Sequence, residues 1–557
     1  MTWPRLPSWA ASALTALLPA ALFLLLLSIQ PVAVSAAPRA APTGLTRYVA
    51  PTGSDASPAC ALGAPCQTVQ RALAVAQPGD EIHVAAGTYT GSMFAGDIDQ
   101  GVSATAIITQ DIAALRGGYS ADFSMQDPQA NPTILSASGT PGAYVLLVVG
   151  TATIVDGFTL TGATGACSSP ACSNHYPGGA VRLRGGTPTL RHNRIENNAA
   201  YQRGGGIYVS DGAVATIDAN LIDSNSVDGN GGGLYVQSAN ALITNNQILS
   251  NVATFEGGGI YIDFNVPAVI NNNSIGYNRA VNMFSAGGGG VRTIGDHAVV
   301  IVKHNDVFSN TIFGGGAGLN MGGPAIVDGN SVHHNFLMDN PDPHAIHGWG
   351  GALILAGVTQ PVTVTNNLVY ANHGSGVQSV NSTQVAFVNN TVADNVHVLP
   401  DSGTEADAYL IWFDGPPGGP VTMTVFNNIL ANNANCGLFY HNAPGGITSA
   451  HNDTWNNHAG AANYCEQASP GAGDLNADPL FANAAAADYH LSIGSPALDV
   501  GASTQAPAHD KDCVSRPQGA GFDLGAYELI VRALGRPLGL NHMVFLPFIQ
   551  VTAPLTC

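Results

Sequence analysis

Short runs of alternating apolar and polar residues recur along most of the chain. One copy reads Asn220-Leu-Ile-Asp-Ser-Asn225 and is followed by Gly231-Gly-Gly-Leu-Tyr-Val236. Both phrases recur in the copies that begin at Asn193 and Asn246, weaker copies follow from Asn273 on, and the successive spacings are 27, 26, 27, 32, 25, 37, 23, 38 and 24 residues. The copies begin at Asn193, Asn220, Asn246, Asn273, Asn305, Asn330, Asn367, Asn390, Asn428 and Asn452. A period in the twenties with occasional enlargement indicates a solenoid whose insertions form loops.

The repeat also indicates which solenoid to expect. Each copy holds β-branched and aromatic runs such as Ile207-Tyr-Val209 and leaves no room for two helices. Asn tolerates the left-handed backbone conformation, so we expect it at coil corners, where its amides can form a hydrogen-bonded ladder. Ile222 and its counterparts should point inward, and the glycine runs suit close backbone approach. The predicted fold is all-β: a single-stranded right-handed parallel β-helix with coils about 4.8 Å apart.

The N-terminal residues predict export and a cap. Residues 1–36 combine Arg5, an apolar run over 10–29 and small residues before a cleavage site, as in a signal peptide. An uncleaved membrane anchor is the alternative. We therefore predict a secreted or cell-surface protein with no membrane contact beyond this segment. Residues 67–77 predict a short helix, with Val69, Leu73 and Ala76 on one face, that covers the open end of the β-helix.

The eight cysteines agree with an oxidising compartment. Proximity in sequence predicts the disulfides Cys60–Cys66 and Cys167–Cys172. Cys436–Cys465 and Cys513–Cys557 is one of several pairings open to the rest. None of the cysteines has the spacing of a zinc site, and no metal site is predicted.

Charge narrows the class of partner. The net charge is -19 and only 10% of residues are charged. This balance argues against nucleic acid, which needs clustered Lys and Arg to bind phosphate. Between Arg292 and Arg516 the positive residues are Lys303 and Lys511, so an acidic polysaccharide would find little attraction there.

Several segments resemble a known family. Arg47-Tyr-Val-Ala50, Pro78-Gly-Asp80 and Ile82 to Tyr89 look like the N-terminal cap of secreted bacterial pectate-lyase-like right-handed β-helix proteins. The run from Val155 to Leu160 is similar to their entry into the repeats. This resemblance implies the fold and export, but no particular activity.

The C-terminal part resembles the choice-of-anchor Q domain of surface β-helix proteins. The matching residues include Asn476-x-Asp478-Pro and Asp523-x-Gly-Ala-x-Glu528. The resemblance implies a β-rich cap module, in which we predict a structural ion pair from Arg516 to Asp523 or Glu528. The predicted boundaries are signal peptide 1–36, linker 37–46, N-terminal cap and first coils 47–150, β-helix repeats 151–465, choice-of-anchor Q-like module 466–530 and tail 531–557.

Two enlarged coils hold the candidate chemistry. Insertions at 336–350 and 396–419 should lie on one edge, two coils and about 10 Å apart. Aromatic faces can stack on a sugar while carboxylates accept its hydroxyl protons. The candidate substrate-binding residues are His347, Trp349, Tyr409 and Trp412, and the candidate catalytic carboxylates are Asp339, Asp342, Asp407 and Asp414. In the alternative interpretation, the two tryptophans only cover small cores of their own loops.

These features predict an exported β-helix protein that contacts glycans and is not an enzyme, because the repeats are regular and catalytic signatures are missing. Its expected partner is an extracellular polysaccharide or cell-surface glycan, and it is expected to be a monomer. The alternative is a carbohydrate-active enzyme. A hydrolase needs two carboxylates about 5–9.5 Å apart. A lyase would use Arg279, Arg292 and Lys303 near the sugar carboxylate. No cofactor is predicted, and calcium remains open for the lyase.

Overall fold

The computed structural model describes residues 44–94, 103–165, 179–263, 266–282, 287–313, 315–338, 350–396, 407–415, 419–460 and 463–530. All of them belong to one compact unit. The predicted signal peptide, Cys167, Cys172 and the tail at 531–557 lie outside the described residues. In the described ranges, none of the helices has the length and apolarity to cross a membrane.

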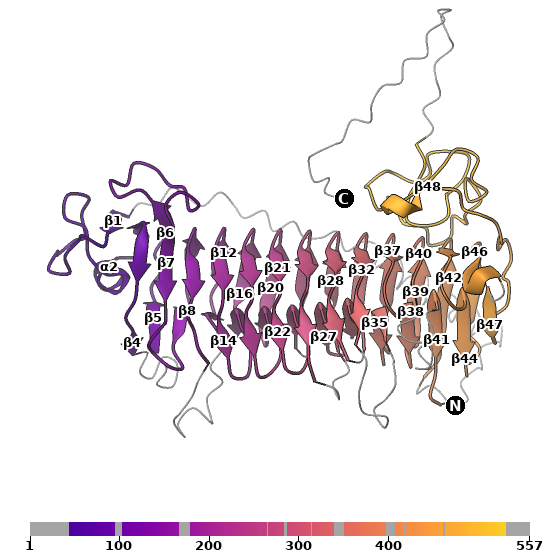
Figure 1. The fold of residues 1–557 in the computed structure, drawn as a ribbon, viewed down its shortest axis with the longest axis horizontal. Coiled ribbons are helices and arrows are strands. Elements are labelled where there is room, and N and C mark those ends of the chain that lie inside the picture. Colours follow the sequence, from indigo (N-terminus) through magenta and orange to yellow (C-terminus); the bar gives the residue numbers. More distant parts are fainter. Residues whose placement is uncertain are drawn as a thin grey trace, which may run out of the picture. The chain divides into compact units, whose positions relative to one another are not determined.

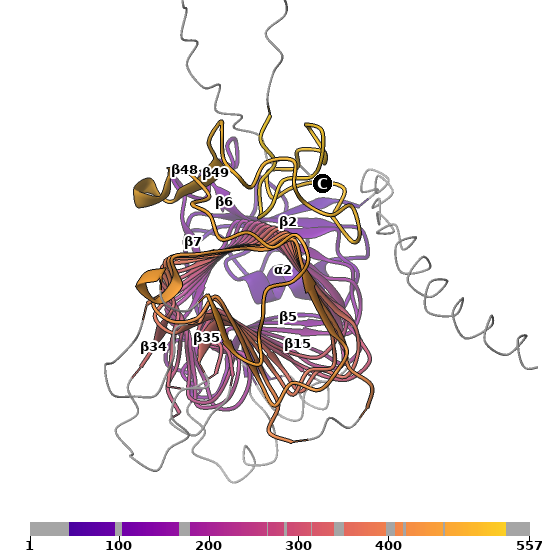
Figure 2. The same cartoon turned by 90° about the vertical axis from the view of Figure 1, so that its right-hand side faces the viewer.

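The strands stack into long parallel sheets, which Figure 1 shows from the side and Figure 2 along the stacked coils. One coil contributes β15 (Ile207–Ser210), β16 (Val214–Asp218), β17 (Leu221–Asp223) and β18 (Ser226–Val227) in turn. We call the sheets that contain β16, β17, β18 and β15 sheets 1, 2, 3 and 4. Pairing of these strands is parallel with two exceptions. The antiparallel pairs are β4 (Met93–Phe94) with β5 (Ser103–Ile108) and β48 (Phe481–Asn483) with β49 (Asp488–Leu491).

Sheet 1 consists of β1 (Thr46–Val49), β2 (Glu81–Ala85), β6 (Ala114–Tyr119), β9 (Ile154–Asp156), β12 (Thr189–Arg191), β16, β20 (Asn240–Thr244), β24 (Ala268–Asn271), β28 (Val300–Lys303), β32 (Ala325–Asp328), β36 (Val362–Thr365), β39 (Gln384–Val388), β42 (Thr422–Phe426) and β45 (Ile447–Ala450). Sheet 2 consists of β3 (Gly87–Tyr89), β7 (Thr133–Ser136), β10 (Thr159–Thr161), β13 (Arg194–Glu196), β17, β21 (Gln247–Leu249), β25 (Ser274–Gly276), β29 (Asp306–Phe308), β33 (Ser331–His333), β37 (Leu368–Tyr370), β40 (Thr391–Ala393), β43 (Ile429–Ala431) and β46 (Asp453–Trp455).

Sheet 3 is shorter and consists of β14 (Ala199–Ala200), β18, β22 (Val252–Ala253), β26 (Arg279–Ala280), β30 (Thr311–Ile312) and β34 (Phe336–Leu337). Sheet 4 consists of β4 (Met93–Phe94), β5 (Ser103–Ile108), β8 (Tyr144–Val149), β11 (Val181–Arg184), β15, β19 (Leu234–Val236), β23 (Ile260–Ile262), β27 (Val291–Ile294), β31 (Leu319–Gly322), β35 (Gly351–Ala356), β38 (Ser375–Val380), β41 (Tyr409–Trp412), β44 (Leu438–His441) and β47 (Tyr464–Glu466).

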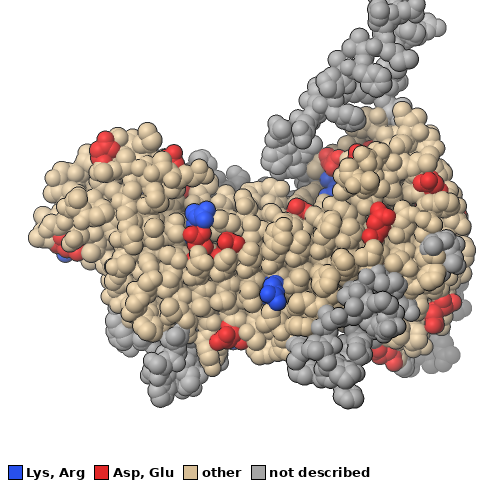
Figure 3. Space-filling model, viewed as in Figure 1, with Lys and Arg blue, Asp and Glu red and all other residues tan. Residues whose placement is uncertain are grey.

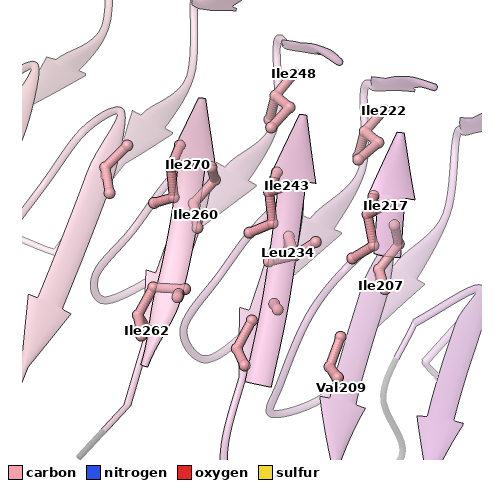
Figure 4. Close-up of a cluster of buried hydrophobic side chains, with 14 of the residues drawn as sticks. Ile207, Val209, Ile217, Ile222, Leu234, Ile243, Ile248, Ile260, Ile262 and Ile270 are labelled. Carbon is pink, nitrogen blue, oxygen red and sulfur yellow. The ribbon is translucent and has the colours of Figure 1, made fainter. Parts of the chain in front are cut away.

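The core consists of apolar columns inside the coils. Ile222 pairs in register with Ile195 in the preceding coil and Ile248 in the following one, and all three are fully buried. Figure 4 shows such columns across successive coils. The predicted inward position of Ile222 is therefore confirmed.

Asparagine ladders run along both ends of sheet 2, as predicted. The backbone N–H and Nδ2 of Asn220 donate to Asn246 Oδ1 at 2.9 and 3.0 Å, and its Nδ2 also donates to the Leu190 carbonyl at 3.0 Å. A second ladder links Asn225 to Asn251 in the same way. Each buried amide thereby fixes the register between coils.

The predicted left-handed conformation belongs to the residue before each ladder asparagine. Ala219 has φ 53° and Ser224 has φ 54°, immediately before Asn220 and Asn225. The ladder side chain must turn inward to reach the next coil, so the chain reverses one residue earlier. The glycine prediction holds: a Cβ on Gly205 would lie 2.3 Å from the Gly232 carbonyl oxygen.

The N-terminal end is closed by α2 (Val69–Val75), whose Val69, Ala72 and Leu73 are buried. Thr68 caps it by accepting a hydrogen bond from the Arg71 N–H at 3.1 Å. This confirms the predicted helix. The disulfides Cys60–Cys66 and Cys436–Cys465 are both present.

The C-terminal module packs along the side of the β-helix. It contains β48 (Phe481–Asn483), β49 (Asp488–Leu491) and the 3-10 helix η4 (Ala484–Ala486), while η3 (Asn457–Gly460) lies in the last coil. Tyr489 and Ala526 pack against Leu368 of β37 and Ala393 of β40. Most of the described module is turns rather than strands.

Polar contacts also fasten the module to the coil corners. The Gly525 N–H donates to the Asn427 carbonyl at 2.7 Å. The predicted ion pair exists between Arg516 Nη1 and Glu528 Oε2 at 2.7 Å, with both side chains fully buried.

Candidate functional site

The structure places four of the eight predicted site residues. Asp339, Asp342, His347 and Trp349 lie outside the described residues. The predicted second insertion, 396–419, is not a single loop, because β41 crosses it and pairs with β38 and β44. Its residues therefore fall at different places around the coil.

Tyr409 is a core residue, which corrects its prediction as a substrate contact. It is fully buried, its ring stacks on Phe387 with centroids 4.3 Å apart, and its hydroxyl lies 2.8 Å from Ser379 Oγ. Burial raises the pKa of the Tyr409 hydroxyl. A ligand at the protein surface cannot reach this side chain.

Asp407 is also fully buried, which corrects its prediction as a catalytic carboxylate. Its Oδ1 accepts the Cys436 N–H at 3.0 Å and Asn435 Nδ2 at 2.8 Å. It therefore fastens one coil to the next at the entry to β41.

Trp412 and Asp414 lie together at the exit of β41. Trp412 Nε1 donates to Asp414 Oδ1 at 2.9 Å, and its ring stacks on His441 with centroids 3.7 Å apart. Asn381 Nδ2 donates to Asp414 Oδ2 at 2.7 Å. The exposed carboxylate thus holds the indole, which favours the interpretation that Trp412 covers its own corner.

The described carboxylates of this region do not form a hydrolytic pair. Asp407 precedes β41 and Asp414 follows it, and the strand between them alone spans about 10 Å at about 3.3 Å per residue. Hydrolysis across a glycosidic bond needs about 5–9.5 Å.

The cations considered for a lyase are separated as well. Arg279 lies in β26 of sheet 3, Arg292 in β27 of sheet 4 and Lys303 in β28 of sheet 1. Adjacent coils carry them, but three different faces present them. The structure therefore does not bring together on one face the three cations considered for the lyase alternative.

A surface cleft of about 420 Å³ lies where sheet 3 turns into sheet 4, a site that sequence reasoning missed. We call it the Tyr201–Phe255 cleft. Tyr201 and Phe255 each expose 45% of their surface, and Asp228 of the coil between them is exposed too. Its lining residues are Tyr201, Gln202, Arg203, Asp228, Gly229, Asn230, Tyr235 and Phe255.

Three consecutive coils shape this cleft. The Phe255 N–H donates to the Gly229 carbonyl at 3.0 Å, and the Asn230 N–H donates to the Gln202 carbonyl at 3.2 Å. Tyr201 and Phe255 belong to coils two apart, about 10 Å along the axis. A Cβ on Gly229 would lie 1.9 Å from the Gln202 carbonyl oxygen, so the middle coil carries no side chain at that level.

A partly buried polar network supports one wall. Arg203 Nη1 donates to Gln237 Oε1 at 2.7 Å, and Gln237 Nε2 donates to Asp263 Oδ2 at 2.8 Å. The Tyr235 hydroxyl donates to the same Asp263 oxygen at 2.7 Å. The Arg203 guanidinium carbon lies 5.6 Å from the Tyr235 ring centroid, within cation–π range.

A tyrosine column extends this support along sheet 4. Tyr208, Tyr235 and Tyr261 pair in register and are nearly buried, with successive ring centroids 5.6 and 4.9 Å apart. Ring packing as well as hydrogen bonding therefore holds this wall of the cleft.

A sequence signal for the cleft does exist. The three residues before each glycine triplet change from coil to coil: Tyr201-Gln-Arg203, Asp228-Gly-Asn230 and Thr254-Phe-Glu256. The glycines and asparagines fix the corner, so these positions are free to carry surface chemistry.

Charge is sparse at the surface. The face in Figure 3 shows scattered Lys, Arg, Asp and Glu side chains among uncharged residues. Among the residues that the structure describes, no group of three or more His, Cys, Asp or Glu side chains is placed to hold a metal ion.

A family model for a right-handed β-helix region matches residues 279–454, and one described as a protein of unknown function (DUF1565) matches residues 52–312. A search of curated proteins found no match.

Several solved structures resemble this chain in three dimensions at low sequence identity. Pectate lyase Pel9A is 14% identical, with 87% of this chain and 96% of that chain covered and a TM-score of 0.35. The PL6 alginate lyase AlyGC is 15% identical, with 72% and 52% covered and a TM-score of 0.42. The GH136 lacto-N-biosidase from Eubacterium ramulus is 12% identical, with 73% and 67% covered and a TM-score of 0.29.

The stacked parallel sheets and the matching β-helix region define the class: this is a right-handed parallel β-helix protein, as the repeat predicted.

Proposed function

We propose that this chain is an exported β-helix protein that binds glycans at the Tyr201–Phe255 cleft and does not cleave them. The observation that carries the proposal is the cleft itself. Two exposed aromatic residues flank an exposed carboxylate beside a hydrogen-bonded wall. Aromatic rings offer an apolar face to the C–H side of a sugar, while the Asp228 carboxylate can accept hydrogen bonds from its hydroxyl groups.

Binding without cleavage is supported by what surrounds the candidate acids. Asp407 is buried, and Asp414 is occupied by Trp412 and Asn381. Neither of them faces a second described candidate carboxylate at the separation that hydrolysis needs. Asp339 and Asp342, outside the described residues, remain the predicted partners of the hydrolase alternative.

Export and surface attachment form part of the proposal. The signal-like residues 1–36 and the two disulfides support an oxidising location. We propose that residues 466–530 act as a choice-of-anchor Q-type module, which the Arg516–Glu528 pair holds in shape.

The test is glycan binding by the mature chain, measured on a panel of immobilised polysaccharides. Tyr201→Ala and Phe255→Ala should each weaken binding at least tenfold. Tyr277→Ala is the matched control, because Tyr277 exposes 57% of its surface at a different corner. Equal binding by all three variants would remove the cleft from the proposal. New reducing ends or unsaturated products would replace binding with enzymatic activity.

A further inference from the structure

The charges around the Tyr201–Phe255 cleft bear on the kind of glycan that it takes. Its charged lining residues are one cation, Arg203, and one carboxylate, Asp228. Glu256 adjoins the lining, since its N–H donates to Asn230 Oδ1 at 3.0 Å, and it pairs with Arg292 at 3.6 Å. Asp263 lies behind the wall. Two cations thus stand against three carboxylates.

The cleft's cation already serves the wall. Arg203 donates to Gln237 Oε1 at 2.7 Å and to the Tyr208 hydroxyl at 3.2 Å, and it lies against the Tyr235 ring. Gln237 carries this contact on to the Asp263 carboxylate. A ligand carboxylate would have to compete with these bonds, and bidentate binding of a carboxylate needs the guanidinium fork available.

The exposed charge in the cleft has the opposite sign from that needed for an acidic sugar. Asp228 is exposed between the two aromatic coils. A uronate placed between Tyr201 and Phe255 would bring its carboxylate toward Asp228, and like charges at close range repel. A neutral sugar avoids this repulsion and can donate hydroxyl protons to the same carboxylate.

The spacing suits a ring-shaped group. Coils two apart place the aromatic residues about 10 Å from each other along the axis, about two successive ring contacts of ~4.5–7 Å. The cleft volume of about 420 Å³ lies within the range of small-ligand sites.

We infer that the Tyr201–Phe255 cleft binds a neutral saccharide, rather than a polyuronate, with its ring between Tyr201 and Phe255 and its hydroxyls on Asp228. This inference rests on the proposed glycan-binding function and specifies its ligand class.

The test compares neutral polysaccharides (xylan, mannan and mixed-linkage β-glucan) with polygalacturonate and alginate, using the mature chain in titration calorimetry at about 50 and 500 mM salt. We expect a neutral glycan to bind at least tenfold more tightly than either polyuronate, with little dependence on salt. Screening weakens a charge-based contact far more than stacking and neutral hydrogen bonds.

The direction in which Asp228→Asn changes the affinity distinguishes a neutral ligand from a uronate. For a neutral ligand it removes a charge-assisted acceptor and should lower affinity about tenfold. For a uronate it removes a repulsion and should raise affinity. Asp223→Asn, an equivalent change one corner away in β17, is the control and should leave binding unchanged.

The outcomes separate the two claims. Polyuronate binding that falls with salt and strengthens in Asp228→Asn would overturn the neutral-saccharide inference and leave glycan binding at the cleft intact. Failure of the folded protein to bind either class would overturn both. If the affinity for a neutral glycan were unchanged in Tyr201→Ala and in Asp228→Asn, the binding site would lie elsewhere and the inference would be overturned.

Discussion

The Arg516–Glu528 pair offers the sharpest test of how the C-terminal module is held. Both side chains are fully buried, with Nη1 and Oε2 2.7 Å apart. Arg516 Nη2 also donates to the Gly525 carbonyl at 2.8 Å, and Nη1 donates to the Asp523 carbonyl at 3.2 Å. Arg516→Ala would strip these partners and leave the Glu528 carboxylate in a dry site.

The expected cost is large because a buried charge loses its partner. Removing one member of a buried pair costs about 3–5 kcal/mol, whereas an exposed pair contributes about 0–1 kcal/mol. Arg194 is the matched control: it lies 2.7 Å from Glu196, the same distance, but its side chain is 57% exposed. The N–O distance is the same in both pairs, whereas burial and the two backbone carbonyls bonded to Arg516 distinguish them.

Native-state hydrogen exchange of amides at the module interface measures this loss of stability locally. The Gly525 and Ala526 N–H groups donate to Asn427 O and Thr391 Oγ1 across the module interface, at 2.7 and 3.0 Å. If their exchange tracks module opening, about 3–5 kcal/mol corresponds to roughly 100- to 4,000-fold faster exchange, at ~1.4 kcal/mol per factor of ten. Arg194→Ala should leave both amides within about fivefold.

A second variant isolates the cause. The Gln518 and Asp523 N–H groups donate to the two different oxygens of Glu528, at 2.9 and 3.2 Å. Arg516→Ala with Glu528→Gln removes the charge and keeps an acceptor oxygen for one of these two N–H groups. It should recover part of the protection. Equal exchange in the Arg516→Ala and Arg194→Ala proteins, or a double variant no better than the single one, would refute the reasoning.

Three further outcomes are expected. Asn251→Ala should lower the urea midpoint clearly more than Asn240→Ala, an exposed control, because it leaves the Asn225 N–H and Nδ2 without their acceptor, at about 1–3 kcal/mol for each buried donor. Ile222→Asp should prevent folding, as seen by loss of the far-ultraviolet β signal, since an unpaired charge would enter a fully buried column. Burial lowers the pKa of His490, but hydrogen bonds to Asp512 and Asp488 outweigh it and raise the pKa to about 9. Because this folded-state pKa lies above the unfolded value of about 6.5, the contribution to stability is full below pH 6.5 and is lost as pH rises through 9. Urea titrations at pH 6 and 10 should show a larger loss in the natural protein than in His490→Asn.

The repeating part of the fold could be predicted because every coil imposes the same demands. Ile222 must fill a column, Asn220 and Asn225 must each join a ladder, and Gly205 must pass close to the next coil's backbone. Because each coil needs the same residue types at the same positions, the sequence repeats with the length of a coil. The prediction was wrong about one conformation: the left-handed residue precedes each ladder asparagine. The repeat length is the same for either position, so it could not distinguish them.

The candidate site was harder to predict because its residues do not repeat. In β41 the sequence Tyr-Leu-Ile-Trp is apolar throughout, so alternation could not show that Tyr409 points inward and Trp412 outward. Registering the strand on its neighbours settles it: Tyr409 pairs with the inward Val377 and Leu438. An enlarged interval between repeats therefore locates extra chain, but it does not say which of its residues reach solvent.

The same reasoning turns attention from insertions to variable positions within regular coils. At the Tyr201–Phe255 cleft the intervals are ordinary, 27 and 26 residues, and the ladder asparagines and glycines are all in place. With the corner fixed by those residues, the three positions before each glycine triplet can change without disturbing the core. Two aromatic rings, a carboxylate and a guanidinium collect at those positions across three coils, whereas Tyr409 and Asp407 in the enlarged coil are consumed by packing and coil-to-coil hydrogen bonds. Among the described residues, the side chains that line this cleft thus come from coils of regular length, where the ladders and the glycines already fix the backbone and leave the corner positions variable.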